Sequence, residues 1–484
     1  MPVSRLPDHP SAEALRKQAK TLLRYARAGV PEALAMVEEF HPRRPAEPRL
    51  ADAQLVTARR YGFASWGRLM KHLETVGRYT RSPHAVPASA DPADEFLRLA
   101  CLTYGADDLD RPRAADALLA ADPGLATANV YTMAATGEAA ALRAVLAAGP
   151  SDATAQGGPF GWEPLLYLAY ARLKRPGRPV EAARVLLDHG ADPDAGFLWD
   201  GLPSPFTALT GAFGGGEGDQ PPHPNGLELA RVLLAAGADA NDAQTVYNLG
   251  LGGSWSDDTA HLELLLEYGL GRGDGGPWRE RLRPALASPA DLLSEELATA
   301  ALRGGPRRVR LLLSYGVPVD RPGSHPAFGG RTPYELAVVH GHREVAELLA
   351  AAGARRPDLG EREAFEAACM SGDAGAVAAF GPDVLARALA ESPGLVHRAA
   401  EHGRPDVVRL LAGLGFDVGH LDRCTPLHLA AWNDDLDTVQ ALLALGADPS
   451  VRDAEHDSTP LGWAEYGGKR RVAEYLRMTY PRLM

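Results

Sequence analysis

Several features that would assign the sequence to a class of protein at once are scarce or missing. The 484 residues include only three cysteines, Cys101, Cys369 and Cys424, which are too few and too scattered for a disulfide framework. No segment approaches the roughly 18 uninterrupted apolar residues of a membrane helix, and MPVSRLPDHP at the start has no apolar run of signal-peptide length. We therefore expect a cytoplasmic protein that does not cross a membrane.

Signatures of catalysis and metal binding are missing too. The sequence has no GxSxG nucleophile elbow, no Walker loop and no GxGxxG after a strand. His340 and His342 lack the HExxH spacing that places two ligands on one helical face. His420, Cys424 and His428 recur every four residues, but no fourth ligand accompanies them. We expect no catalytic residue, no metal and no cofactor, although enzymatic activity is not excluded.

Positive charge is scarce outside the N-terminal part. The net charge is −12, divided into +7 over residues 1–84 and −19 over the remainder. The acidic remainder should repel nucleic acids and acidic membrane surfaces. The basic part contains no helix-turn-helix pattern and no series of stacking aromatic residues, so we do not expect nucleic-acid binding.

A repeat is clearest in TPLHLAAWNDDLDTVQALLALGADP, residues 425–449. Pro426 suits a first helical turn, because its missing N–H would have no partner there. Leu436, Val439 and Leu442 then recur at helical spacing, and Gly446 suits the left-handed position after a helix. This stretch resembles the ankyrin repeat, whose TPLHxA start and period of roughly 33 residues are distinctive.

The same closing glycine recurs along most of the chain, at Gly149, Gly190, Gly237, Gly269, Gly316, Gly353, Gly415 and Gly446. The resemblance implies an all-α solenoid of about ten helix-turn-helix units over residues 93–484. In such arrays the histidine of TPLH hydrogen-bonds backbone near the next loop, which is the role expected for His428 and, one repeat earlier, for His397.

A small helical module is predicted over residues 1–82, with Ser11 and Ser65 as helix caps. Its DAQLVTARRYGFASW stretch resembles a module that precedes ankyrin arrays in many bacterial proteins. Residues 83–92 are predicted to form a linker to the array.

Four insertions interrupt the repeats, at about residues 172–179, 214–222, 252–258 and 270–293. The first three fall between the paired helices of adjacent repeats, so stacking should place them side by side along one rim. The fourth should add a short helix that braces the middle of the array.

The region around residues 196–258 is also rich in aromatic side chains, some of them on a long finger, residues 191–206. We expect the insertions and the finger to wall a pocket; the alternative is that these aromatics only pack the large loops onto the array. The predicted binding residues, which also include two tryptophans near the C-terminus, are Tyr167, Phe197, Trp199, Asp200, Phe206, Tyr247, Asn248, Trp255, Asp257, Trp432, Asp434 and Trp463.

Two functions fit these patterns. The first is a non-catalytic scaffold or adaptor that binds a protein or peptide, preferably a basic one, in its acidic concave groove. The alternative is an enzyme or small-molecule-binding protein that uses the walled pocket.

Overall fold

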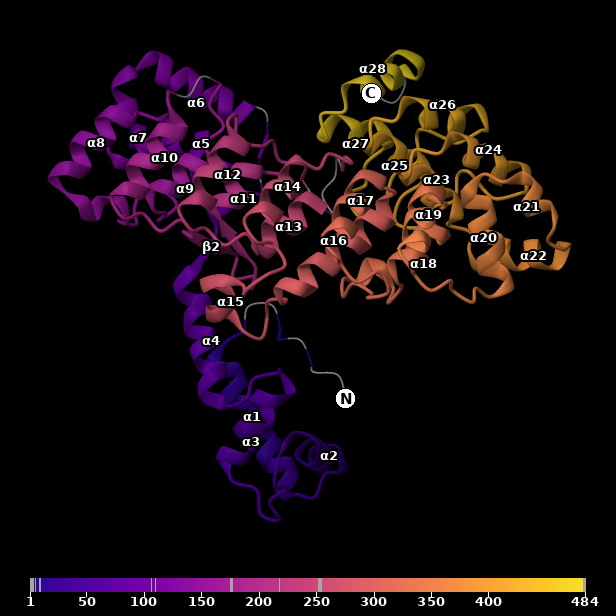
Figure 1. Ribbon diagram of the computed structural model, residues 1–484, viewed down its shortest axis with the longest axis horizontal. Coiled ribbons are helices and arrows are strands. Elements are labelled where there is room, and N and C mark those ends of the chain that lie inside the picture. The colour runs from indigo at the N-terminus through magenta and orange to yellow at the C-terminus, as the bar shows by residue number, and fades with distance from the viewer. Residues whose placement is uncertain are drawn as a thin grey trace. The chain divides into compact units, whose positions relative to one another are not determined.

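The computed structural model describes residues 4, 6–7, 10–105, 107–108, 110–174, 177–216, 218–250 and 255–481. Over these residues the chain is mostly helical, as predicted (Figure 1). It divides into two compact units, of which one comprises Met1–Leu249 with Leu264–Leu292 and the other Gly250–Glu263 with Leu293–Met484. No helix among the described residues is long and apolar enough to cross a membrane.

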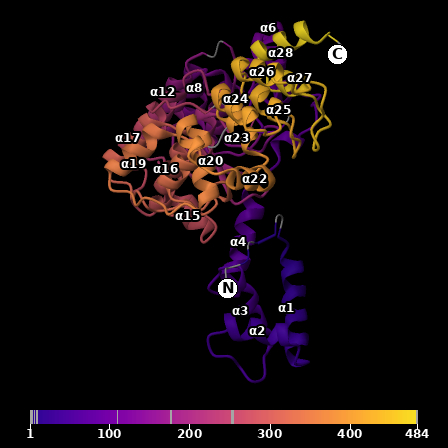
Figure 2. The same ribbon diagram turned by 90° about the vertical axis from the view of Figure 1, so that its right-hand side faces the viewer.

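The predicted N-terminal module lies wholly in the first unit. Its helices are α1 (Ala12–Arg27), α2 (Pro31–Phe40), α3 (Leu50–Arg60) and α4 (Trp66–Tyr79). Both predicted caps are present, because Ser11 accepts a hydrogen bond from Ala14 N at 3.0 Å and Ser65 accepts one from Arg68 N at 3.3 Å. Helix α1 packs on α2 and α3, and burial of its apolar face holds the three helices together (Figure 2).

Paired helices follow the module in the first unit. They are α5 (Pro92–Ala100), α6 (Asp110–Ala121), α7 (Val130–Thr136), α8 (Ala139–Ala148), α9 (Pro164–Tyr170), α10 (Pro179–Asp188), α11 (Ala208–Phe213), α12 (Gly226–Ala235), α13 (Ala243–Gly250) and the inserted α15 (Gly276–Leu282). Helix α14 (Ala260–Glu267) begins in the second unit and ends in the first. The first helices of successive pairs contact each other, as do the second helices α8, α10 and α12, so the pairs stack in register as expected.

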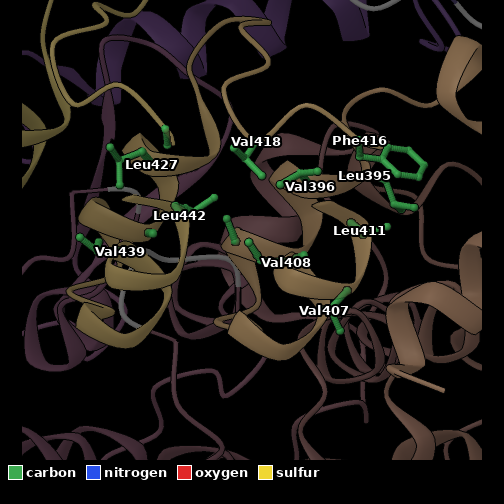
Figure 3. Packing of buried hydrophobic residues seen from close by; sticks show 14 of the residues in the cluster. Leu395, Val396, Val407, Val408, Leu411, Phe416, Val418, Leu427, Val439 and Leu442 are labelled. Carbon is green, nitrogen blue, oxygen red and sulfur yellow. The ribbon is translucent and has the colours of Figure 1, made fainter. Parts of the chain in front are cut away.

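The second unit continues the pairing. Its helices are α16 (Pro289–Arg303), whose start up to Leu292 is counted with the first unit, α17 (Pro306–Ser314), α18 (Pro333–Val339), α19 (Arg343–Ala351), α20 (Glu361–Ser371), α21 (Ala374–Ala378), α22 (Pro382–Glu391), α23 (Leu395–Glu401), α24 (Pro405–Gly413), α25 (Pro426–Trp432), α26 (Leu436–Ala444), α27 (Pro460–Tyr466) and α28 (Arg470–Thr479). Figure 3 shows Val396 and Val408 of one pair and Leu427 and Leu442 of the next within one cluster of buried side chains. A helix pair of this size cannot bury its apolar face alone, so the core runs from pair to pair.

Side chains at the repeat starts connect neighbouring pairs. His428 Nδ1 accepts hydrogen bonds from Thr425 N at 3.2 Å and Thr425 Oγ1 at 2.8 Å, and Nε2 donates to Ser458 O at 3.0 Å in the next loop. His397 makes the equivalent contact with Cys424 O at 2.8 Å. The structural role predicted for both histidines is confirmed.

The closing glycines behave as predicted except for Gly149. Gly446, for example, has φ of 96°, which an L side chain rarely adopts. Gly149 instead has φ of −141°. Pro150 follows it, and a residue before proline is confined to extended backbone, so this pair ends differently.

A small sheet is the one element of the described chain that an all-α prediction missed. Strands β1 (Thr80–Arg81), β2 (Gly196–Trp199) and β3 (Pro205–Thr207) form it in the order β1-β2-β3. β2 and β3 pair antiparallel as the finger's hairpin, and β1 at the end of α4 pairs parallel with β2. The sheet therefore joins the N-terminal module to the array.

Candidate functional site

The tip of the finger holds the segment that connects the module to the array. The Trp199 ring stacks on His84, with centroids 4.6 Å apart, and its Nε1 donates a hydrogen bond to Thr103 O at 2.8 Å. The carboxylate of Asp200 lies 3.4 Å from His84 Nε2. Trp199 and Asp200, two of the predicted binding residues, thus make internal contacts across the predicted linker.

The other predicted aromatics of this region lie in the core of the first unit. Tyr167, Phe197 and Phe206 are 0%, 2% and 6% exposed. Trp162 stacks on Phe197, with centroids 4.9 Å apart, and lies 5.4 Å from Tyr167. Tyr167, Phe197 and Phe206 therefore pack in the core, which was the alternative to their lining a pocket.

A hydrogen bond joins one residue of the first insertion to one residue of the second, where the stacking argument expects the two to be close. Arg172, at the start of the first insertion, donates from Nε to Pro221 O at 2.7 Å and from Nη2 to Gly211 O at 2.6 Å. Its Nη1 donates to Ala169 O and Ala171 O, both at 3.0 Å. Burial lowers the pKa of Arg172 to about 10, which leaves the guanidinium charged at neutral pH.

Asn248 fastens the second insertion to the next repeat. Its side chain is buried, and Nδ2 donates to Gly214 O at 3.2 Å, while its backbone oxygen accepts from Gly216 N at 3.1 Å. Gln244 donates to Asn248 Oδ1 at 2.8 Å. The predicted binding residue Asn248 is therefore used in holding the loop, and the neighbouring Tyr247 is half-buried.

The third insertion belongs to the second unit, and its residues 252–254 lie outside the described residues. Asp257 accepts hydrogen bonds from Arg307 N at 2.8 Å and Arg308 N at 3.0 Å, two N–H groups in the first turn of α17, where the helix itself supplies no acceptor. The Arg308 guanidinium lies 5.4 Å from the ring centre of Trp255. The predicted binding residues Trp255 and Asp257 thus fasten their loop to α17.

Near the C-terminus, two predicted tryptophans form a half-buried pair on the first helices of adjacent repeats. Trp432 of α25 and Trp463 of α27 meet edge to face, with ring centroids 6.0 Å apart. Trp463 Nε1 donates to Asp453 Oδ2 at 3.0 Å, and the Lys469 ammonium lies 5.5 Å from the Trp432 ring centre. Their orientation is therefore set by neighbours while part of each ring stays accessible.

The acidic residues beside this pair also support helices. Asp434, another predicted binding residue, accepts a hydrogen bond from Val472 N at 2.9 Å in the first turn of α28. Asp435 accepts one from Thr438 N at 3.2 Å and caps α26. Negative charge suits both positions, because a helix N-terminus carries partial positive charge.

The described residues hold neither a metal site nor an activated cysteine thiol. Within the residues that the structure covers, no group of three His, Cys, Asp or Glu side chains is placed to hold a metal ion. All three cysteines are buried, and burial raises the thiol pKa of Cys101 and Cys369 to about 12 and that of Cys424 to about 11.

The fourth insertion contributes residues that the sequence reasoning did not single out. Trp278 of α15 is buried, donates from Nε1 to Asp194 O at 2.8 Å, and meets Tyr79 of α4 edge to face at 4.9 Å. Arg281 lies over both rings. The insertion was expected to brace the array, and it also contacts the module. The tryptophan of GDGGPW was the signal in the sequence that could have identified this contact, because tryptophan side chains are usually largely buried.

These helix pairs, with their capped starts and glycine-ended second helices, define a helical repeat array. Residues 396–481 match the family model for ankyrin repeats, in three copies. The ankyrin repeat protein nuc-2 of Neurospora crassa is 26% identical over 262 residues, which cover 50% of this chain and 22% of that protein. The chain thus spans less than a quarter of the length of this relative. Ankyrin repeats generally mediate protein–protein interactions.

Proposed function

We propose that the protein is a non-catalytic adaptor and that Trp432 and Trp463 form the centre of its partner-binding surface. The observation that carries this proposal is that the two rings are half-buried, oriented by Asp453 and Lys469, and still partly accessible. Tryptophans that are held in place lose little freedom on binding and dominate the energetics of many interfaces.

The other predicted aromatic binding residues support this choice, because their side chains already contact other parts of the protein. Trp199 is stacked on His84, and Phe197 and Phe206 are buried in the core. The Trp255 ring lies on the backbone of Gly305, where an added Cβ would come within 2.5 Å of it. A partner would have to displace internal contacts at each of these positions, whereas the Trp432–Trp463 pair can be covered without such a change.

A basic segment is the partner that the charges favour. Residues 85–484 carry a net charge of −19. Asp437 of α26 and Glu465 of α27 are exposed and lie close in the sequence to Trp432 and Trp463. Acidic surfaces raise the association rate of basic partners and discriminate against acidic ones. Binding should accordingly weaken as ionic strength rises.

Capture from a lysate of the source cells, followed by affinity measurement on the captured partner, tests the proposal. Replacement of both Trp432 and Trp463 by alanine should weaken binding at least about 30-fold, the effect of losing about 2 kcal/mol of contact. Tyr315→Ala is the matched control, since Tyr315 is a 44% exposed aromatic of the same unit. Equal binding by the double variant and the control would refute this location.

A further inference from the structure

A cavity of about 570 Å³ lies in the first unit, where the N-terminal module meets the finger and the fourth insertion. Leu6 and Phe63 line it from the module, Leu202 and Pro203 from the tip of the finger, and Pro284 from the insertion. Pockets for small molecules typically have volumes of about 300–1,000 Å³ and mainly apolar walls. The volume of this cavity falls within that range, and most of its lining residues are apolar.

One polar side chain stands out in this lining. His72 of α4 is 5% exposed, and its ring lies 5.0 Å from that of Phe63. Its Nδ1 is buried and has no hydrogen-bonding partner. Leaving such a buried nitrogen without a partner is unfavourable, and a ligand donor that reaches it would remove that cost.

The lining also restricts the charge of a ligand. Among the described residues, the lining contains no Asp, Glu, Lys or Arg. Burial also lowers the pKa of His72, so its imidazole is neutral at physiological pH. A charged ligand would lose its hydration here, and none of the described lining residues offers an opposite charge.

The walls are held by the contacts that join the module to the array. Val76 lines the cavity and packs with Leu198, Trp278 and Leu282 in one apolar cluster. Gly201, with φ of 77°, turns the finger so that its neighbours Leu202 and Pro203 reach the cavity. A molecule bound there would contact the module, the finger and the insertion together.

We propose that this cavity binds an uncharged, mainly apolar small molecule that makes one hydrogen bond with His72. Such a ligand stabilises the junction between module and array, because it binds only when both are in place. This inference is independent of the adaptor surface around Trp432 and Trp463.

Fluorescence titration of the full-length protein with N-phenyl-1-naphthylamine tests the proposal. This probe is neutral, apolar and carries one N–H donor. We expect the fluorescence of the probe to rise and saturate, with one binding site per chain. Leu202→Trp fills the cavity from a partly exposed position and should weaken binding at least tenfold. His72→Phe keeps the apolar ring but removes the polar atom and should weaken binding about fivefold, the effect of one net hydrogen bond.

A second cavity of the module supplies the control. It measures about 640 Å³, and Thr21, Tyr25 and Met36 are among its lining residues. Thr21→Trp should leave probe binding unchanged. Ala285→Trp, which blocks the first cavity from the opposite wall, replaces Leu202→Trp if that variant has an altered circular dichroism spectrum. Absence of saturable binding, binding that survives both blocking variants, or loss of binding on Thr21→Trp would each overturn the proposal.

Discussion

Trp199 stacks on His84 with their ring centroids 4.6 Å apart, so a finger of the repeat array closes over the segment that leads out of the N-terminal module. The same indole donates to Thr103 O, and the strand that contains it pairs with β1. A residue that looks like a recognition anchor in the sequence is therefore part of an internal junction.

Trp199→Ala should loosen this junction. The variant loses the stack and the hydrogen bond of a half-buried indole, and we expect a loss of about 2 kcal/mol in local stability. Hydrogen exchange should accelerate over residues 80–105 and in β2, while residues 396–481 keep their protection. Trp199→Phe retains the stack with His84, so its exchange rates should lie between those of the wild type and the alanine variant. Unchanged exchange over residues 80–105 in the alanine variant would contradict the assigned role.

Arg172→Met should release the two neighbouring insertions. The carbonyl oxygens of Pro221 and Gly211 would lose their charged donor in a buried setting, at a cost of about 2–4 kcal/mol. Arg172→Lys places a charge nearby but cannot reproduce the guanidinium geometry, so the expected order of thermal stability is wild type, lysine, methionine. A methionine variant as stable as wild type would show that the guanidinium does not hold the loops.

Asp257→Ala should destabilise the start of α17 by about 1 kcal/mol, the usual effect of losing a helix cap. Asp257→Asn retains an acceptor and should recover most of the loss. Urea unfolding of the three proteins measures the difference. If alanine leaves stability unchanged but lowers partner affinity, Asp257 is a binding residue and not a cap.

The second unit should lose stability as the pH falls below about 6.5, the ordinary histidine value. His340 Nδ1 lies 2.7 Å from His402 Nε2, and the ring centroids of His342 and His402 are 4.8 Å apart. Burial lowers the pKa of all three, and nearby positive charge lowers it further. The charged groups facing this cluster are Arg303, Arg331, Arg398 and Arg404, with Glu401 paired to Arg303.

The sign follows from proton binding. The folded state binds fewer protons than the unfolded state, so the stabilisation is complete above the unfolded pKa and declines below it, by up to about 1.4 kcal/mol per pH unit for each histidine. Urea unfolding between about pH 5 and pH 8 measures this slope. His402→Gln should make the slope shallower, and an unaltered slope would exclude the cluster as its source.

The repeat architecture could be predicted because its signals are local. Thr425, Pro426 and His428 are close in sequence and cap one helix, and Gly446 follows the helix that it ends. Stacking led us to expect the insertions side by side along one rim, and the hydrogen bond from Arg172 to Pro221 O joins one residue of the first to one of the second.

The junction could not be predicted, because its partners are distant in sequence and individually unremarkable. A two-residue strand such as β1 has no periodicity to detect, and its pairing with β2 depends on where α4 ends in space. The aromatic residues of the finger carried no mark that distinguished core from surface, so Phe197 and Phe206 looked like binding residues. Composition identified the unusual region but not the direction in which its side chains point.

The affinity of the captured partner for two double variants decides where on the protein the partner binds. One variant replaces Trp432 and Trp463 with alanine, and the other replaces Trp199 and Trp255. Binding should fall at least about 30-fold in the first and stay within about threefold of wild type in the second, whose tryptophans make internal contacts. The reverse result would place the binding surface at Trp199 or Trp255 and contradict a surface centred on Trp432 and Trp463.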